Sequence, residues 1–225
     1  MSGFLRTERP ADGVVLVTLD RAERRNALST ALRQEANALL AELADDETVR
    51  ALVVTGAGSA FCAGFDLGEF GPALGDPALS EALWASSDEW HQRWFAFPVP
   101  TIAAVNGPAL AGGFDLAVLC DLRVAGPTAT FAHPEIRFGD VVYSPLHDLV
   151  GGAVARDLCF TARTIDAQEA FRLGVVGRVV DDPVAVALAL ADQVAASPRD
   201  VLVRVKAKAV RRSGVAATGA GTLDL

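Results

Sequence analysis

Thr101–Asp121 reads TIAAVNGPALAGGFDLAVLCD, and this stretch decides the fold. Its first five residues form an apolar run of strand length, which the turn residues Asn106-Gly107-Pro108 follow. Gly112-Gly113 then opens an apolar helix that carries Asp115 in its first turn. Glycines at a helix start leave backbone N–H groups uncovered. An oxygen that gains negative charge would be stabilised there, beside a carboxylate.

The same arrangement occurs earlier in the chain. Ala51–Thr55 is another apolar run of strand length, and Gly56 ends it. Gly64 indicates a tight turn, and Asp66 is a candidate N-cap. Two amides from two such turns could converge on one oxygen and form an oxyanion hole. Ordinary turn glycines are the alternative that the spacing leaves open.

Strands alternate with helices along the rest of the chain, which is typical of an α/β protein with strands buried on both faces. Further strands are predicted at Val14–Leu19, Leu122–Ala125, Ala129–Ala132 and Val175–Val180. Helices are predicted over about 30–44, 80–97, 152–161, 166–173 and 183–197, the first with Ser29 as its N-cap. Gly71–Pro77 is interpreted as a flexible break, and no linker separates two domains.

Composition narrows the class of protein. The chain has 225 residues, 51% of them hydrophobic, which is enough for one sizeable core. The net charge of −8 and the absence of a basic run argue against a nucleic-acid partner. The apolar stretches are too short to span a bilayer, and the charged start of the chain does not resemble a secretory signal. We therefore expect a cytoplasmic protein without a membrane partner.

The cysteines and histidines show no metal-binding pattern. Cys62, Cys120 and Cys159 are scattered in apolar contexts, so we expect buried free thiols. The three histidines of the chain lack the spacing of metal ligands, and the sequence predicts no metal site.

Five ordered segments resemble the crotonase (enoyl-CoA hydratase/isomerase) superfamily, over about residues 10–210. These segments are Asp20–Leu28, Phe61–Leu67, Ala104–Gly113, Phe131–Gly139 and Leu158–Val176. The resemblance implies a crotonase-like spiral of repeated ββα units with peripheral helices, assembled as a homotrimer or hexamer. It implies an acyl-CoA-processing core at residues 1–200. Residues 201–225 are expected to form a shortened, partly disordered C-terminal segment.

In this family a thioester carbonyl sits between two backbone amides, and the matching positions here are Phe65 and Gly112. Asp115 and Glu135 match the two carboxylates that hold water in a hydratase, although Asp115 is one methylene shorter than the usual glutamate. A charge satisfied by the helix dipole is the alternative reading of Asp115.

Two further features have alternative readings. A salt bridge with Arg137 or Arg123 is the alternative reading of Glu135. The residues Trp84, Trp90 and Trp94 either line the acyl pocket or belong to the helix-packing core.

The resemblance also implies a surface for coenzyme A. The matching residues are Arg24, Arg25, Ala27, Ala63, Asp66, Leu67 and Gly68. The two arginines are suited to phosphate groups, and solvated surface arginines are the alternative. No permanently bound cofactor is expected, because coenzyme A enters as part of the acyl-CoA thioester substrate.

The resemblance implies an enzyme of fatty-acid or related metabolism that forms an oxyanion-stabilised enolate. Hydration of a 2-enoyl-CoA is the first choice, and double-bond isomerisation is the alternative. The dienoyl-CoA isomerase branch uses a further aspartate where this chain has Tyr143, whereas simple enoyl-CoA isomerases need only the residue at the Glu135 position. A third reading is a non-catalytic acyl-CoA-binding homologue.

Overall fold

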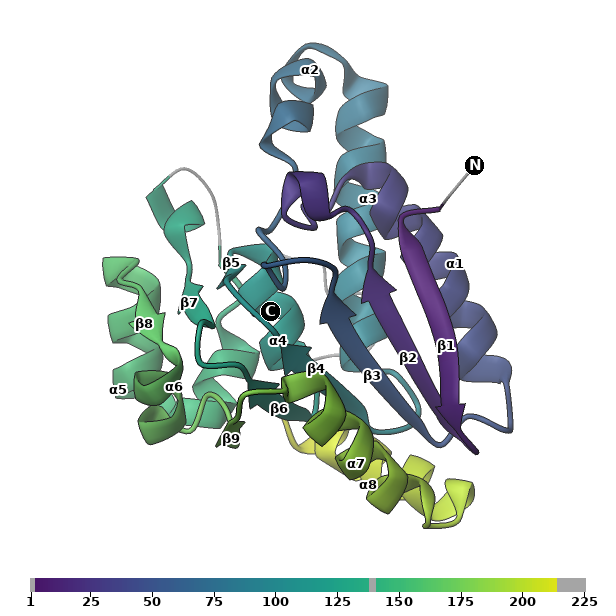
Figure 1. The fold of residues 1–225 in the computed structure, drawn as a ribbon. Coiled ribbons are helices and arrows are strands. Elements are labelled where there is room, and N and C mark those ends of the chain that lie inside the picture. The colour runs from purple at the N-terminus through teal and green to yellow at the C-terminus, as the bar shows by residue number, and fades with distance from the viewer. Residues whose placement is uncertain (1–2, 138–140, 214–225) are drawn as a thin grey trace.

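A mostly parallel sheet forms the centre of the computed structural model, which describes residues 3–137 and 141–213 (Figure 1). Its strands lie in the order β1-β2-β3-β4-β6-β9, and a smaller sheet has the order β5-β7-β8. The strands are β1 (Leu5–Ala11), β2 (Val14–Leu19), β3 (Ala51–Gly56), β4 (Thr101–Val105), β5 (Ala109–Leu110), β6 (Leu122–Ala125), β7 (Thr130–Ala132), β8 (Ile165–Asp166) and β9 (Arg178–Val179). Strand β1 is antiparallel to β2, and the rest of the large sheet is parallel.

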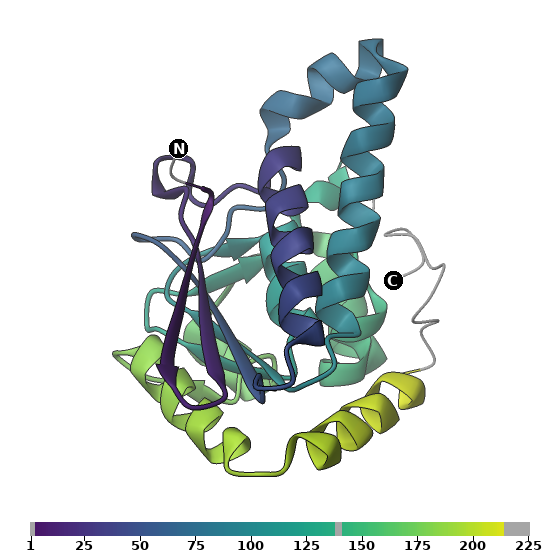
Figure 2. The same cartoon turned by 90° about the vertical axis from the view of Figure 1, so that its right-hand side faces the viewer.

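Helices cover both faces of this sheet. They are α1 (Thr30–Asp45), α2 (Phe70–Gly75), α3 (Pro77–Phe95), α4 (Gly112–Leu119), α5 (Ser144–Thr161), α6 (Ala167–Leu173), α7 (Pro183–Ala195) and α8 (Arg199–Arg212). Short 3₁₀ helices are η1 (Ala22–Arg24), η2 (Leu67–Glu69) and η3 (Pro134–Arg137). Figure 2 shows α1 and α3 side by side, with α7 and α8 running along the base.

The core lies on both sides of the large sheet. The central strands β2, β3 and β4 are buried along their whole length, as their continuous apolar sequences predicted. One face packs against α1, α3 and α4, and the other packs against the alanines Ala187, Ala191 and Ala195 of α7. The three cysteines are free and buried, which confirms that prediction.

Several predicted elements match the structure closely. Strands β2, β4 and β6 have the predicted bounds. Helix α1 begins after Ser29, whose side chain accepts a hydrogen bond from the Leu32 amide at 3.2 Å. The architecture is the expected α/β fold, in which each amide turn follows a buried parallel strand.

Other predictions were wrong or incomplete. Residues 71–77 do not form a break, because Phe70–Gly75 folds into α2 and Pro77 starts α3. The predicted strand Val175–Val180 shrinks to two residues in β9. The helix predicted at 152–161 begins earlier, at Ser144, with a kink at Gly151. Strand β1 and helix α8 were not predicted. Residues 201–212 of the expected shortened, partly disordered C-terminal segment belong to α8, and residues 214–225 of that segment lie outside the described residues.

Helix α8 is attached to the base of the sheet by partly buried polar contacts. The Lys206 ammonium lies 2.7 Å from both carboxylate oxygens of Asp121, just before β6. Arg199 donates to the carbonyls of Val49 and Ala44, each at 3.0 Å. In the part of the chain that the structure describes, every helix is too short or too polar to cross a membrane.

Candidate active site

The first turn follows β3 and contains Gly64, and the second follows β4 and leads into α4 at Gly112. The two turns lie next to each other because β3 and β4 are parallel neighbours. Asn106 follows β4, and its side-chain Nδ2 donates to the Gly56 carbonyl at the end of β3, at 2.9 Å. Further along, Cys62 and Ala109 form an isolated parallel bridge, in which the Leu110 amide donates to the Cys62 carbonyl at 3.0 Å. These side-chain and backbone hydrogen bonds align the two turns over several residues.

Glycine is required where the turns touch. Gly64 has φ +87°, and an added Cβ would lie 2.7 Å from the Ala111 Cβ and 3.2 Å from the Gly112 nitrogen. An added Cβ on Gly113 would lie 2.2 Å from the Cys62 carbonyl oxygen. Ala111 itself has φ 51° and ψ −130°, a conformation that favours glycine. The chain therefore holds a strained alanine between the two turns.

The amides of Phe65 and Gly112 do not donate to any acceptor among the described residues. Around Phe65 the hydrogen bonds run instead from the Leu28 amide to the Gly64 carbonyl and from the Asp66 amide to the Leu28 carbonyl, at 2.8 and 3.3 Å. Gly112 is the first residue of α4, where an N–H has no partner within the helix. The structure thus places two backbone N–H groups, both without an acceptor among the described residues, in adjacent turns.

The Phe65 side chain is held from two sides. An added Cβ on Gly112 would lie 3.0 Å from the Phe65 ring, so glycine allows the ring to pack here. On the other side the Arg33 guanidinium lies 4.4 Å from the ring centroid, a cation–π distance. Arg33 is fully buried and donates to the Leu83 carbonyl at 3.1 Å and to the Ser86 hydroxyl at 3.1 Å. These contacts fix the turn that carries the Phe65 amide.

The two candidate carboxylates come from different elements. Asp115 lies in the first turn of α4 and is only 6% exposed. Glu135 lies in η3, directly after β7, and β7 pairs with β5 immediately before α4. The His133 imidazole lies between them, with its Nδ1 2.8 Å from Glu135 Oε1 and 3.6 Å from Asp115 Oδ1. On α3, His91 Nε2 lies 3.8 Å from Asp115 Oδ2.

The protonation of the His133–Glu135 pair is perturbed. Burial and the nearby Asp115 carboxylate raise the pKa of the Glu135 carboxyl, although the His133 hydrogen bond opposes this rise. Burial disfavours the His133 imidazolium, but the hydrogen bond to Glu135 and the charge of Asp115 outweigh it and raise the pKa of the imidazole. Both groups therefore titrate above their ordinary range.

The sequence did not predict the two histidines at this site. His133 precedes Glu135 by two residues in a segment that was already singled out, which was the available signal. The approach of His91 is a tertiary contact between α3 and α4, with no local signal. The alternative salt bridge of Glu135 is wrong, because its ion-pair partner among the described residues is His133. Arg123 donates instead to backbone carbonyls, including that of Val175 at 2.7 Å.

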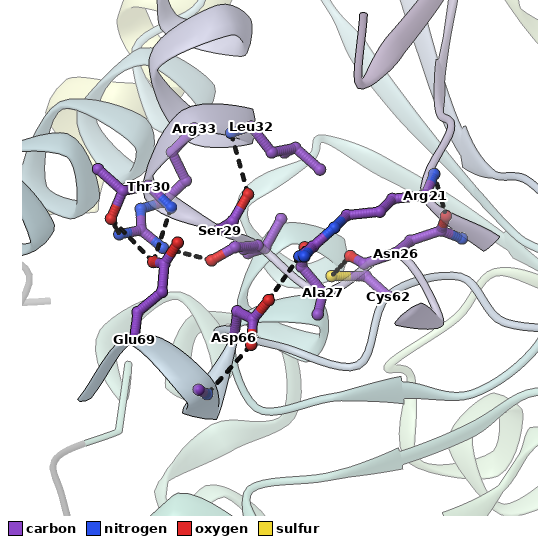
Figure 3. A network of polar contacts seen from close by, with 12 residues as sticks. Arg21, Asn26, Ala27, Ser29, Thr30, Leu32, Arg33, Cys62, Asp66 and Glu69 are labelled. Carbon is purple, nitrogen blue, oxygen red and sulfur yellow. Dashed lines mark hydrogen bonds and ion pairs between the residues drawn. The ribbon is translucent and has the colours of Figure 1, made fainter. Parts of the chain in front are cut away.

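Polar contacts join the 21–28 loop, which is part of the segment expected to bind coenzyme A, to the turn that carries Phe65 (Figure 3). Arg21 forms an ion pair with Asp66 at 2.7 Å. The buried Asn26 donates from Nδ2 to the carbonyls of Ala57 and Ala60, at 3.0 and 2.9 Å. Neither Arg21 nor Asn26 was predicted as a functional residue. The two side chains attach the 21–28 loop to the turn that carries Phe65.

The predicted coenzyme A residues gather along these two segments. Arg24 and Arg25 are exposed, Ala27 is buried, and Leu67 and Gly68 are exposed at η2. The Ala63 amide donates to the Arg25 carbonyl at 3.0 Å, which joins the loop to the turn. On α3, Trp90 and Trp94 belong to the core, whereas Trp84 is 43% exposed.

Asp115, His133 and Glu135 are the described residues that come nearest to a cation site, since their ligand atoms lie within 4.8 Å of one another. However, the 2.8 Å separation of His133 Nδ1 and Glu135 Oε1 is that of a hydrogen bond. A proton between these atoms accounts for the contact. The absence of a metal site stays a prediction.

A sequence profile described as "Enoyl-CoA hydratase/isomerase" matches residues 9–221. The chain belongs to the enoyl-CoA hydratase/isomerase family. It is 39% identical over 222 residues to "Probable enoyl-CoA hydratase EchA14" of Mycobacterium tuberculosis, a match that covers 94% of this chain and 82% of that protein.

Solved structures agree with this family assignment. An enoyl-CoA hydratase of Mycobacterium smegmatis is 35% identical, with a TM-score of 0.85, over 96% of this chain and 85% of that chain. An enoyl-CoA hydratase/isomerase of Xanthobacter autotrophicus Py2 is 33% identical, with a TM-score of 0.87, over 94% of this chain and 80% of that chain. The protein is therefore an enzyme of the enoyl-CoA hydratase/isomerase family with the crotonase fold.

Proposed function

We propose that the protein hydrates a 2-enoyl-CoA thioester at the site formed by the two amide turns and the two carboxylates. The observation that carries this proposal is a pair of buried oxygens, Glu135 Oε2 and Asp115 Oδ1. Neither accepts a hydrogen bond from a described residue. Buried acceptors in proteins are normally paired. A water molecule has two donors and could serve both oxygens, which is the arrangement that hydration requires.

The chemistry follows from the position of each group. The thioester oxygen accepts hydrogen bonds from the amides of Phe65 and Gly112, which stabilise the enolate. Glu135 takes a proton from the water as its oxygen bonds to Cβ, and the double-bond electrons move into the enolate. Glu135 then delivers that proton to Cα, which completes the addition of one water, gives a 3-hydroxyacyl-CoA and restores the Glu135 carboxylate. Asp115 is the second group that orients the water.

Double-bond isomerisation is the second candidate, and the raised pKa of Glu135 favours it. A raised pKa makes the carboxylate a stronger base, which can take a proton from Cα and return it at Cγ without a water nucleophile. The shorter side chain of Asp115 also suits a reaction in which one group does the proton transfer. The third candidate, a non-catalytic acyl-CoA-binding role, would need only the amide turns and the coenzyme A segments.

We propose further that coenzyme A enters as part of the substrate and that no cofactor is bound permanently. Arg24 and Arg25 are exposed beside the first turn, where phosphate groups could reach them. We also propose a cytoplasmic homotrimer or hexamer that acts in fatty-acid or related metabolism. Residues 1–200 would form the catalytic core, and the segment after them would be its shortened C-terminal extension.

Turnover of crotonyl-CoA compared with a 3-enoyl-CoA separates these candidates. Hydration removes the absorbance of the conjugated enoyl thioester, whereas isomerisation of a 3-enoyl-CoA creates it. Glu135→Gln keeps the shape of the side chain and removes its basicity, so turnover should fall by about 10²- to 10⁴-fold. Glu47→Gln, at an exposed position after α1, is the matched control and should leave turnover unchanged.

Wild-type turnover by folded Glu135→Gln would rule out this mechanism. A wild-type protein that binds crotonyl-CoA but turns over neither substrate would support the non-catalytic role instead.

A further inference from the structure

His133 is the one imidazole placed between the two candidate carboxylates, and the proposed reaction gives it no role so far. Its side chain is fully buried. The ring stacks on Phe114, with centroids 4.6 Å apart and an interplanar angle of 25°. Its Nδ1 lies at hydrogen-bond distance from Glu135 Oε1. A histidine that only filled space in the core would not need to face two acids.

The direction of this hydrogen bond follows from its surroundings. Nδ1 faces Glu135 Oε1 at 2.8 Å and Asp115 Oδ1 at 3.6 Å. Because a carboxylate oxygen can only accept, Nδ1 carries the proton in both the neutral and the charged imidazole. The other ring nitrogen, Nε2, is buried and has no hydrogen-bond partner among the described residues. The ring is therefore oriented through Nδ1 alone, with Phe114 holding its plane.

We propose that His133 is a positioning residue of the active site, whose Nδ1–H holds Glu135 by Oε1 so that Oε2 is directed at the reacting atoms. The inference rests on the proposed function, because His133 acts through Glu135. The same N–H lies toward Asp115 and reduces the repulsion between two carboxylates that share a buried site. Without it, Glu135 would lose the contact that selects one orientation of its carboxylate.

The charged and titratable groups around His133 come from several elements. Asp115 on α4 and Glu135 on η3 face it directly, and His91 on α3 faces Asp115. The buried thiols of Cys62 and Cys159 lie near the same carboxylates, and burial raises the pKa of these thiols to about 12 and about 11. Those thiols stay neutral near pH 7, so the other titratable groups around Glu135 are Asp115 and the two histidines.

Two substitutions separate a positioning role from a packing role. His133→Asn places an amide nitrogen where Nδ1 lies, so it keeps a hydrogen-bond donor while it loses the ring. His133→Phe keeps the ring and its stacking on Phe114 but puts a C–H where the donor lies. We expect His133→Phe to lower kcat by about 10- to 100-fold with a smaller change in KM, because a misplaced carboxylate slows the chemical step. His133→Asn should recover most of that loss.

The pH profile provides a second readout. With Glu135 as the base, activity falls at low pH as the carboxylate gains a proton. Replacement of His133 by phenylalanine removes the donor that favours the charged carboxylate. The acid limb of kcat/KM should therefore move to higher pH in His133→Phe. Packing loss alone would lower the melting temperature without moving this limb.

A measurement that needs no turnover keeps this inference separate from the proposed function. In ¹⁵N-histidine-labelled wild-type protein, we expect Nδ1 of His133 to be protonated and its N–H resonance to shift in Glu135→Gln. This result would stand even if the protein hydrated no substrate. A bare Nδ1 would overturn the inference.

Other outcomes would also overturn it. Equal kcat values for the wild type and both variants would remove any role for His133, and higher activity in His133→Phe than in His133→Asn would show a packing role. Loss of wild-type turnover in a chelator, with recovery on addition of Zn²⁺, would show that the three side chains hold an ion instead.

Discussion

The two ends of the candidate site differ in the groups that form them. At one end the groups are the backbone amides of Phe65 and Gly112, and at the other they are the side chains of Asp115, His133 and Glu135. A backbone amide has no protonation change near neutral pH, and its direction depends only on the path of the chain. A carboxylate–imidazole cluster depends on protons and rotamers. The first end should therefore be sensitive to added volume, and the second to charge and pH.

The largest effect should come from closing the amide end. Gly112→Val puts a branched side chain where even a Cβ would lie 3.0 Å from the Phe65 ring, so the ring must shift and the space beside the two amides is filled. We expect kcat/KM to fall by about 10²- to 10³-fold, the usual cost of one lost oxyanion donor. Calorimetry with an acyl-CoA should show weaker binding as well.

Gly71→Val is the matched control, because an added Cβ at Gly71 meets nothing within 4 Å. It should retain both activity and affinity. Unchanged acyl-CoA binding by a folded Gly112→Val protein would show that the thioester does not lie at this helix start.

A smaller effect should come from lengthening the acid at the other end. Asp115→Glu extends the carboxylate by one methylene and should hold the attacking water better. Since a misplacement of about 1 Å can cost up to about 10²-fold, the ratio of hydration to isomerisation should rise within that limit. The ratio is measured on matched 2-enoyl-CoA and 3-enoyl-CoA substrates. A fall in this ratio would contradict the water-holding role of Asp115.

The smallest effect should be a shift in the pH profile of Asp115→Asn, which is measured separately from the loss of turnover expected if the water needs both carboxylates. The Asp115 charge helps to raise the pKa of Glu135, so its removal lets Glu135 ionise at lower pH. The acid limb of kcat/KM should move to lower pH, opposite to the shift expected for His133→Phe. Gly112→Val, which changes no charge, should leave the limb where it is. An equal shift of the acid limb of kcat/KM in all three variants would show that the two ends of the site do not differ in their sensitivity to charge.

The sequence predicted the amide end better than the acid–base end. Strands β2 and β4 have the predicted bounds because continuous apolar runs between turn residues leave one interpretation. The turn glycines carry the same kind of local signal. The contacts of His133 and His91 with Asp115 join residues far apart in sequence, so only the folded chain reveals them.

The missed elements have physical reasons of the same kind. Strand β1 is a polar edge strand that pairs only with β2, so its sequence lacks the apolar alternation of a half-buried strand. Helix α8 has a polar sequence and is attached by Arg199 and Lys206 to distant partners. In α2, Gly71-Pro72 indicated a break, yet proline is compatible with the first turn of a helix.

The strained Ala111 implies a trade-off at the junction of the two turns. A non-glycine residue in such a conformation costs about 1–3 kcal/mol, which Ala111→Gly would release. Yet the Ala111 methyl group also packs against the turn at Gly64, where an added Cβ would lie 2.7 Å from it. Glycine at position 111 would remove this contact and give the backbone more freedom just before the Gly112 amide. Selection of variants for heat resistance alone would favour that glycine, and it would weaken the fixed separation of the two amides in the same step.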